Sequence, residues 1–348
     1  MKTAVVLYNL GGPDKTDDVQ PFLFNLFNDP MIISVPAPLR WILAKIISRR
    51  RAPIAKDIYK HLGGGSPLLR NTRKQAEALE LQLKTVDENE FCVFVAMRYW
   101  YPTATEVALK IKNSAADQII LMPLYPQYST TTVGSFLKVW EKAVKKIDLD
   151  CKTKSICCYP KELGFISTIS KFIQEALEKI GKDHKTRVLF SAHGLPKKIV
   201  NSGDPYQWQI EQTAQAIVDN ISINNLDWVN CYQSRVGPLE WIGPSTEEEI
   251  RRAGKEKCAV IVVPLAFVSE HSETLVELDI EYKLIADKAN VTEYHRVPTV
   301  SVDKTFIKGL AKVVLSSLSN SSDICSGLPG QVCPKKWSKC PIVKDRVV

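Results

Sequence analysis

One histidine of the chain stands where an open α/β sheet would place its chemistry. His193 lies two residues beyond the apolar run 188–191 and precedes Gly194. Ligands of such sheets bind beyond the carboxyl ends of the strands, so an imidazole there would face a ligand. Imidazole titrates near neutral pH and binds metals, which makes His193 a candidate proton acceptor or metal ligand. Its position alone fits a structural histidine equally well.

An acidic run, residues 269–279, offers partners for this histidine and follows a long apolar run. If a helix begins at its start, Glu270, Glu273 and Glu277 recur at i, i+3 and i+7 and line one face. Most acidic runs are solvated surfaces, but carboxylates crowded in a crevice bind protons more tightly and titrate together. An imidazole with carboxylates also suits iron(II), zinc or manganese. The sequence therefore predicts a site for proton transfer or for a divalent cation.

Other chemistries lack their motifs. The glycine-rich segments 11–12 and 63–65 match neither G-x-G-x-x-G nor a G-K-[ST] ending, so we predict no nucleotide cofactor. There is no H-E-x-x-H pair, and neither Ser129 nor Ser191 stands in G-x-S-x-G, which argues against zinc and serine hydrolases. Without zinc-finger spacing, an aromatic RNA-binding motif or a basic arm, we expect no nucleic-acid partner.

Apolar runs of strand length, separated by helical stretches, would position these residues: 4–7, 91–96, 119–124, 188–191, 228–231 and 259–266. Continuous apolarity is typical of strands buried on both faces, as in a parallel sheet covered by helices. We predict a doubly wound α/β protein of two similar halves with the ligand between them. The predicted parts are an N-terminal half 1–155, a C-terminal half 156–300 with His193 and the acidic helix, a C-terminal helix 301–320 and a Cys-containing tail 321–348.

The composition fits a protein with a large core, since 45% of the 348 residues are hydrophobic. A formal net charge of +8 favours an anionic ligand or a membrane surface. The first apolar run is too short for a signal peptide, and no 18-residue apolar run exists. We therefore expect a cytoplasmic protein without a transmembrane helix.

Residues 36–53 combine apolar side chains, Trp41 among them, with a basic cluster that ends in Arg49, Arg50 and Arg51. This combination suits a membrane interface, and it indicates peripheral contact with the inner face of a membrane. A core helix with a solvated basic end fits the same residues equally well.

Nine cysteines are present, and the length of the chain without an export signal favours free thiols or metal ligands over disulfides. Cys325, Cys333 and Cys340 crowd the last 24 residues. This tail needs an explanation of its own.

Seven motifs, in order between residues 3 and 318, resemble the ferrochelatase family: NLGGP, LGGGSP, YPQYSTTTVGS, SAHGLP, GDPY, QSRVGPLEWIGP and PLAFVSEHSETLVELDIEY. The resemblance implies two Rossmann-like halves with a porphyrin in the cleft between them. It implies that His193 and Glu273 are the catalytic residues and the iron ligands, and that Glu270, His271 and Glu277 line a proton or metal path. It also places six residues at the porphyrin pocket: Leu10, Arg98, Tyr99, Tyr125, Trp241 and Phe267.

Iron insertion requires the metal to lose water, two pyrrole protons to leave and the macrocycle to bend. His193 would take a pyrrole proton or bind iron, Glu273 would complete the iron site, and the two residues can share these roles. The predicted activity is the formation of protohaem from ferrous iron and protoporphyrin IX. The alternatives are a chelatase for another metal or tetrapyrrole, such as coproporphyrin III, and a porphyrin or haem carrier. The sequence leaves the oligomeric state open.

Some members of the family hold a [2Fe–2S] cluster with three C-terminal cysteines and one internal cysteine. The spacing in this tail differs from the usual one, and Thr130 occupies the usual internal position. Four thiolates are needed, so the candidate set is Cys158 with Cys325, Cys333 and Cys340. Free thiols in a flexible tail are the alternative.

Overall fold

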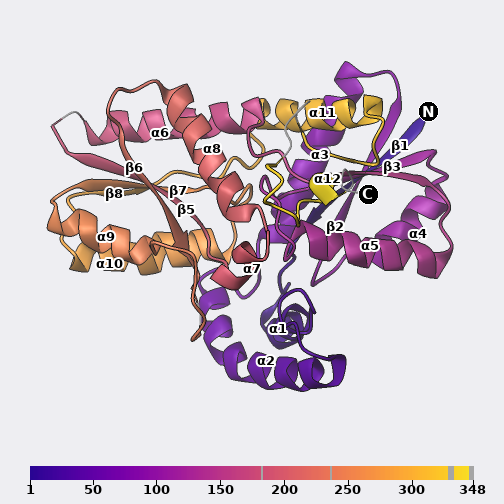
Figure 1. Ribbon diagram of the computed structural model, residues 1–348, viewed down its shortest axis with the longest axis horizontal. Coiled ribbons are helices and arrows are strands. Elements are labelled where there is room, and N and C mark those ends of the chain that lie inside the picture. The colour runs from indigo at the N-terminus through magenta and orange to yellow at the C-terminus, as the bar shows by residue number, and fades with distance from the viewer. Residues whose placement is uncertain (182, 236, 328–332, 345–348) are drawn as a thin grey trace. The chain divides into compact units, whose positions relative to one another are not determined.

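The computed structural model describes the chain except residues 182, 236, 328–332 and 345–348. The described residues form two compact units, Met1–Cys157 with Val314–Cys325 and Cys158–Val313 with Ser326–Val348. Each unit holds a parallel sheet with helices on its faces, which confirms the predicted fold class (Figure 1). Two stretches of the predicted Cys-containing tail, 328–332 and 345–348, lie outside the described residues.

The first unit is built on five strands: β1 (Lys2–Asn9), β2 (Glu90–Met97), β3 (Gln118–Pro123), β4 (Lys152–Ile156) and β9 (Ile324–Cys325). Their order is β2-β1-β3-β4-β9. The apolar strands β1 and β3 are almost wholly buried, as continuous apolar runs require. The helices on the two faces are α3 (Leu68–Val86), and α4 (Ala104–Ser114) with α5 (Val133–Ile147) (Figure 1).

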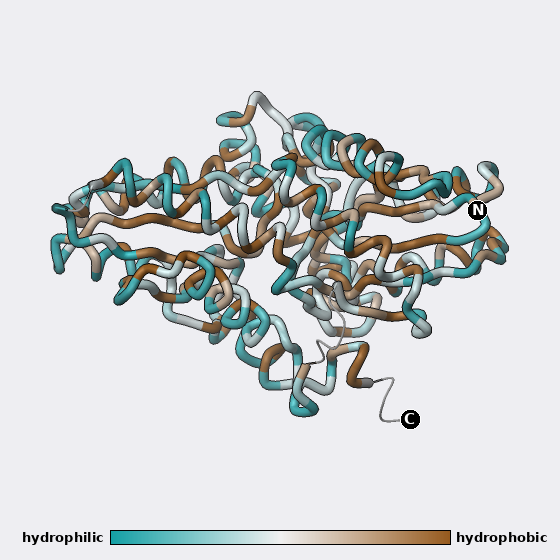
Figure 2. Tube along the Cα trace, turned by 90° about the horizontal axis from the view of Figure 1, so that it is seen from above, coloured by the Kyte–Doolittle hydropathy of each residue, from teal (hydrophilic) through white to brown (hydrophobic). Residues whose placement is uncertain are grey.

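The second unit is built on four strands: β5 (Thr186–His193), β6 (Asp227–Gln233), β7 (Ala259–Pro264) and β8 (Tyr294–Arg296). Their order is β6-β5-β7-β8, and every residue of β7 is buried. Figure 2 shows the apolar strands running between more polar helices. The helices are α6 (Leu163–Ile180) and α8 (Tyr206–Ile221) on one face, α9 (Thr246–Lys255) and α10 (Lys283–Lys288) on the other, and the short α7 (Lys197–Asn201) (Figure 1).

The acidic run forms a different helix from the predicted one. It begins at Glu273, not near Ser269, and it is the π-helix η2 (Glu273–Tyr282), which continues into α10. A π-turn takes in more residues than an α-turn, but in both helices residues four apart, such as Glu273 and Glu277, lie close to one line. Such turns occur often at functional sites.

The basic and apolar segment predicted to contact a membrane, residues 36–53, lies almost wholly on one helix of the first unit, α2 (Ala37–Lys60). η1 (Thr16–Asp18) leads into α1 (Val19–Phe27), which packs against α2. Among the described residues, no helix is long and apolar enough to cross a membrane.

The predicted C-terminal helix is α11 (Lys304–Ser319), and α12 (Pro341–Lys344) follows in the tail. Three strands escaped prediction. β4 is largely polar, while β8 and β9 have only three and two residues, so none of them has an apolar run to reveal it.

Candidate active site

The end of β5 places His193 at the carboxyl edge of the second sheet. Gln233 ends the neighbouring β6, and the parallel register pairs the two residues. The Tyr206 hydroxyl donates a 3.0 Å hydrogen bond to the carbonyl oxygen of His193 and so holds the strand end. Glycine at 194 allows close packing here, because a Cβ would lie 3.0 Å from the Gln233 carbonyl oxygen and 3.3 Å from the Trp241 ring, tighter than most Cβ contacts.

His193 is in direct contact with Glu273. Its Nδ1 lies 2.8 Å from Glu273 Oε2, and the two side chains are 41% and 24% exposed. Within the described part of the chain, Glu273 has no lysine or arginine partner, and no residue hydrogen-bonds to His193 Nε2. The carboxylate therefore orients one ring nitrogen and leaves the other for a ligand.

Glu277 lies beside Glu273 and is held by neutral donors. Ser234 donates to it from the backbone N–H at 2.8 Å and from Oγ at 2.6 Å, and Gln233 Nε2 donates at 3.0 Å. The Tyr282 hydroxyl adds a bond of 3.0 Å. Ser234 Oγ also lies 3.2 Å from Glu273 Oε2, so one hydroxyl stands between the two carboxylates.

These neighbours shift one another's pKa values. Burial alone would lower the pKa of His193, but the charge and the hydrogen bond of Glu273 outweigh it and raise that pKa. Burial alone would raise the pKa of Glu273, but the charge of His193 lowers it to about 2. Burial and repulsion by Glu273 raise the pKa of Glu277. The site thus joins an ionised carboxylate to two groups with increased proton affinity, as proton transfer requires.

Glu270 is held apart from this pair. Its Oε1 lies 2.6 Å from Arg296 Nη1 and accepts the Thr299 N–H at 2.9 Å. Burial would raise the pKa of Glu270, but the attraction of Arg296 lowers it. The prediction that Glu270, Glu273 and Glu277 share one helix face is wrong, because the helix begins only at Glu273 and Arg296 binds Glu270.

His271 is buried, and its ring bonds to the backbone and not to these carboxylates. Its Nδ1 lies 3.1 Å from the Ser269 carbonyl oxygen, and its ring centroid lies 4.6 Å from that of Phe267. Burial lowers the pKa of His271, which favours the neutral ring. The ring therefore supports Phe267, a predicted pocket residue, by packing.

Arg98 and Tyr99 follow β2 and join a polar cluster within the first unit. Arg98 Nη2 lies 2.8 Å from Asp29 Oδ2, and the Tyr99 hydroxyl donates to the same oxygen at 2.6 Å. Arg98 Nε donates to Ser135 Oγ at 2.6 Å, and the guanidinium lies 4.4 Å from the Tyr99 ring centroid. The charge of Arg98 is thus balanced by Asp29 inside the unit.

The other predicted pocket residues also lie beyond strand ends or beside His193. In the first unit, Leu10 follows β1 and Tyr125 lies two residues beyond β3. In the second unit, Phe267 lies three residues beyond β7, and Trp241 forms a β-bridge with Pro196. Leu10, Tyr125, Phe267 and Trp241 are all half-buried, so part of each side chain faces a ligand or solvent.

Three of the four candidate cluster cysteines gather in the second unit. Gln209 Nε2 donates to Cys158 Sγ at 3.5 Å and to Cys333 Sγ at 3.2 Å. A hydrogen bond joins Cys333 to Cys340 and lowers the pKa of the Cys340 thiol to about 6. Cys325 lies in β9 of the first unit. Buried thiols suit an iron–sulfur cluster in kind, but across the described residues no three His, Cys, Asp or Glu side chains are arranged to hold a metal ion.

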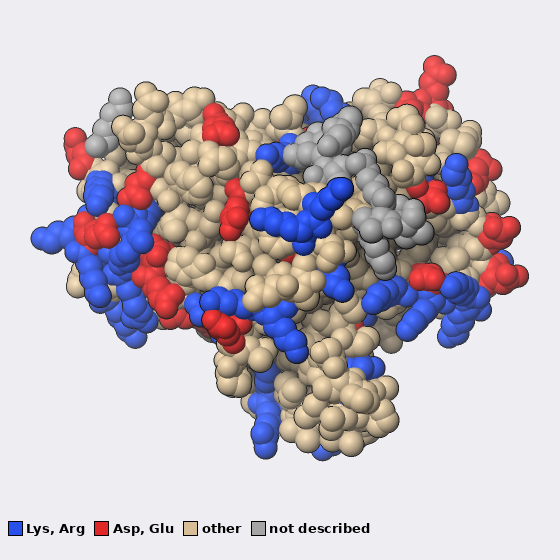
Figure 3. Space-filling model, viewed as in Figure 1, with Lys and Arg blue, Asp and Glu red and all other residues tan. Residues whose placement is uncertain are grey.

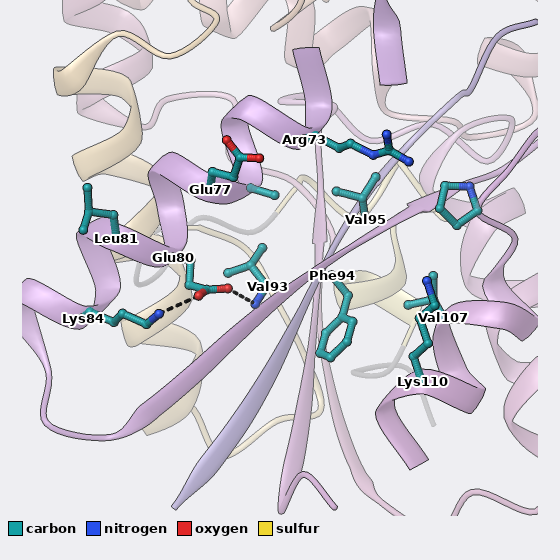
Figure 4. Close-up of a pocket in the computed structure, with 12 residues that line it drawn as sticks. Arg73, Glu77, Glu80, Leu81, Lys84, Val93, Phe94, Val95, Val107 and Lys110 are labelled. Carbon is teal, nitrogen blue, oxygen red and sulfur yellow. Dashed lines mark hydrogen bonds and ion pairs between the residues drawn. The ribbon is translucent and has the colours of Figure 1, made fainter. Parts of the chain in front are cut away.

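A cavity of about 450 Å³ lies elsewhere, in the first unit beside the edge strand β2 (Figure 4). The Glu80 carboxylate lies between Lys84 Nζ, at 2.6 Å, and the backbone N–H of Val93, at 2.9 Å. None of the predicted site residues lines this cavity. Glu80 here satisfies a backbone donor of an edge strand, which is a structural role.

The sequence as a whole matches the family model for ferrochelatase over residues 2–318. The chain belongs to the ferrochelatase family. It is therefore an enzyme, a metal chelatase of haem formation with Fe²⁺ as its substrate, and not a mere porphyrin carrier. The ferrochelatase of Pelagibacter ubique is 50% identical over 98% of both chains. That of Caulobacter vibrioides is 50% identical over 98% of this chain and 97% of its own, and that of Rickettsia bellii is 48% identical over 97% and 94%.

Solved structures share the ferrochelatase fold at low identity. SirB from Bacillus subtilis with Fe³⁺ matches 92% of this chain and 97% of its own, with a TM-score of 0.52 and 13% identity. The sirohydrochlorin chelatase SirB in complex with cobalt matches with a TM-score of 0.50 and 12% identity. These likenesses support the chelatase type of fold.

Sequence reasoning missed the residues that hold this ferrochelatase site together. Gln233 and Ser234 begin the motif QSRVGPLEWIGP, so the sequence indicated a segment that follows a strand. No pattern in it predicts that both residues bind Glu277. Arg296 lies 26 residues after Glu270, on a strand too short to predict. Tyr282 ends the acidic motif, where only the geometry of η2 brings its hydroxyl to Glu277.

Proposed function

We propose that His193 and Glu273 form the centre at which Fe²⁺ is held and pyrrole protons are removed. The 2.8 Å contact between His193 Nδ1 and Glu273 Oε2 is the observation that carries this proposal. It leaves His193 Nε2 to accept a pyrrole proton or to bind iron, and Glu273 to offset the positive charge that develops. Ionised Glu273 also attracts a divalent cation, since the described residues give it no permanent cationic partner.

His193→Ala tests this assignment. We expect turnover to be lost while porphyrin binding, followed by porphyrin fluorescence, stays measurable. A variant that retains wild-type turnover would contradict it.

Glu277 is proposed to take up the proton next. Burial and, after it, repulsion by Glu273 raise the pKa of Glu277, so it accepts a proton more readily than an ordinary glutamate. Glu270 does not take up this proton, because Arg296 binds it and keeps it ionised. His271 has a packing role beneath Phe267.

The proposed porphyrin is protoporphyrin IX. Coproporphyrin III carries two more propionates, which need additional cationic partners, and the charge of Arg98 is already balanced by Asp29. Tyr99, Trp241 and Phe267 would contact the apolar macrocycle, and binding it in a bent shape exposes the pyrrole nitrogens. Anaerobic assays with Fe²⁺ and each porphyrin side by side decide the preference. Higher kcat/KM with coproporphyrin III would overturn it.

The α1–α2 pair is proposed to contact an anionic membrane surface. Trp41 and Ile42 of α2 are 48% and 49% exposed, and Arg49, Arg50 and Arg51 follow on the same helix. The face in Figure 3 shows blue side chains among uncharged ones over these two helices. Exposed apolar side chains beside cations suit an interface with anionic lipids.

Sedimentation with vesicles tests this contact. We expect binding to phosphatidylglycerol vesicles and little to phosphatidylcholine vesicles, with Trp41→Ala weakening it. Leu81→Ala is the matched control, since Leu81 is 67% exposed on α3, away from the basic cluster. Equal loss of binding in both variants would contradict the assignment to α2.

We also propose that Cys158, Cys333 and Cys340, with Cys325, hold a [2Fe–2S] cluster. Gln209 hydrogen-bonds to the buried thiols of Cys158 and Cys333, and Cys333 hydrogen-bonds to Cys340; this gathering supports the proposal, although the thiols must move to complete a ligand set. The cluster would supply one-electron chemistry or tie down the tail. Absorbance beyond 400 nm with stoichiometric iron and sulfide in anaerobically purified protein is expected, whereas nine titratable thiols without absorbance would contradict it.

A further inference from the structure

We propose that Ser234 is a positioning residue that holds the Glu273 and Glu277 carboxylates together and thereby controls the uptake of Fe²⁺. Its hydroxyl stands between them, 2.6 Å from Glu277 Oε2 and 3.2 Å from Glu273 Oε2. The inference rests on the proposed roles of these two carboxylates.

The backbone at Ser234 adopts a conformation that serves this purpose. Its φ of +59° is in the left-handed region, which serine rarely occupies because of the Cβ atom. The residue directly follows β6, where the chain leaves the sheet next to His193. This turn brings both the N–H and the hydroxyl of Ser234 onto Glu277. Strain of this kind persists where surrounding contacts maintain it, often at functional sites.

A neutral donor is what a cation site needs at this point. Two ionised carboxylates repel each other, and a guanidinium between them would remove both the repulsion and the attraction for a metal. Arg296 does this for Glu270 and Asp279. The Ser234 hydroxyl and the Gln233 amide instead hold Glu277 beside Glu273 without adding charge, so the pair keeps its attraction for Fe²⁺.

Another left-handed serine in the same unit provides a matched control. Ser222 has a φ of +55° at the end of α8, and its hydroxyl donates to the Asp219 carbonyl oxygen at 3.1 Å. Removing that hydroxyl costs only a local bond, to a residue three positions earlier on an exposed turn. Ser222→Ala therefore reports the effect of losing a hydroxyl from a strained serine without touching the carboxylates.

The test measures initial rates anaerobically, with Fe²⁺ and protoporphyrin IX varied separately. For Ser234→Ala we expect the KM for Fe²⁺ to rise about tenfold, as the loss of a hydrogen bond to a charged group implies, with the KM for porphyrin unchanged. Ser234→Gly relieves the backbone but lacks the hydroxyl, so it should match Ser234→Ala. Ser234→Thr keeps the hydroxyl and should recover part of the affinity. Ser222→Ala should behave as wild type.

Three outcomes would overturn the inference. One is an unchanged KM for Fe²⁺ in Ser234→Ala. Another is a wild-type KM for Fe²⁺ in Ser234→Gly, which would assign the effect to the strained backbone and not to the hydroxyl. The third is an equal rise in both KM values with a lower midpoint of thermal unfolding, which would show a structural role alone. If His193→Ala is inactive while Ser234→Ala behaves as wild type, only this inference fails and the proposed function stands.

Discussion

Four carboxylates of one short acidic segment fall into two pairs with opposite environments. Arg296 binds Glu270 at 2.6 Å and Asp279 at 2.5 Å, so these two carboxylates are neutralised by a permanent cation. Glu273 instead contacts the titratable His193, and neutral donors hold Glu277. The pKa of Glu270 is lowered and that of Glu277 raised, although the two residues are only seven positions apart.

The comparison shows that acidity in a sequence does not by itself indicate reactivity. A carboxylate paired with a buried guanidinium is fixed in one protonation state, and its function is to hold the fold. A carboxylate paired with an imidazole can exchange protons or accept a metal near neutral pH. The partner decides the role.

The largest contrast is expected between Glu273→Gln and Glu270→Gln. Glutamine keeps the size of glutamate but cannot be ionised, so Glu273→Gln should lower kcat about 10²- to 10⁴-fold. Glu270→Gln should retain most of kcat and lose thermal stability, because it removes one carboxylate from Arg296. Equal losses of kcat in the two variants would erase the distinction between the pairs.

Replacing Arg296 by leucine should strongly destabilise the second unit. The change leaves Glu270 and Asp279 without their cation. These ion pairs are partly buried, so we expect a loss between the roughly 1 kcal/mol of an exposed pair and the about 3–5 kcal/mol of a fully buried one. Denaturant unfolding measures the loss, and residual kcat in the folded fraction should be close to that of the wild type. Lys145→Ala is the control, because it removes an exposed ion pair with Glu141. If Arg296→Leu costs no more stability than this control, the structural role of Arg296 is contradicted.

The His193–Glu273 pair should stabilise the protein in a limited pH window. The raised pKa of His193 contributes stability that is full below its ordinary pKa of about 6.5 and is lost as pH rises through the raised value. The lowered pKa of Glu273 contributes stability that is full above its ordinary pKa of about 4.3 and is lost as pH falls toward about 2.

The midpoint of thermal unfolding of the wild type should therefore exceed that of Glu273→Gln most between about pH 4.3 and 6.5. The difference should shrink on both sides of this window, and on the alkaline side ionised Glu277 adds repulsion against Glu273. A difference that does not change with pH would show that the pair makes no electrostatic contribution.

The smallest effect is expected from Tyr282→Phe. It removes one of several hydrogen bonds to Glu277 and should cost about 1 kcal/mol of stability. The control is Tyr294→Phe, which removes a hydroxyl that donates to the Leu278 carbonyl oxygen at 2.6 Å. If Glu277 takes part in the reaction, only Tyr282→Phe should alter the pH profile of kcat.

The sequence predicted most of what depends on local patterns. Continuous apolar runs located β1, β3 and β7, and the position of His193 beyond a strand indicated a ligand site. The acidic motif led to Glu273, which the structure brings to His193.

Features that depend on distant residues were not predictable in the same way. The partner of Glu270 lies on β8, and the helix η2 begins only at Glu273, so Glu270 is not on its face. Nothing in the residue types near Ser234 indicates a left-handed backbone, since no glycine or asparagine stands at that position.

A double-mutant cycle tests most directly whether His193 and Glu273 act as one unit. The kcat for iron insertion is measured anaerobically for His193→Ala, Glu273→Gln and the double variant. If the 2.8 Å contact carries the chemistry, the losses are not additive and the double variant is about as slow as the slower single variant. Losses that multiply in the double variant would show that the two side chains act independently and would contradict the account.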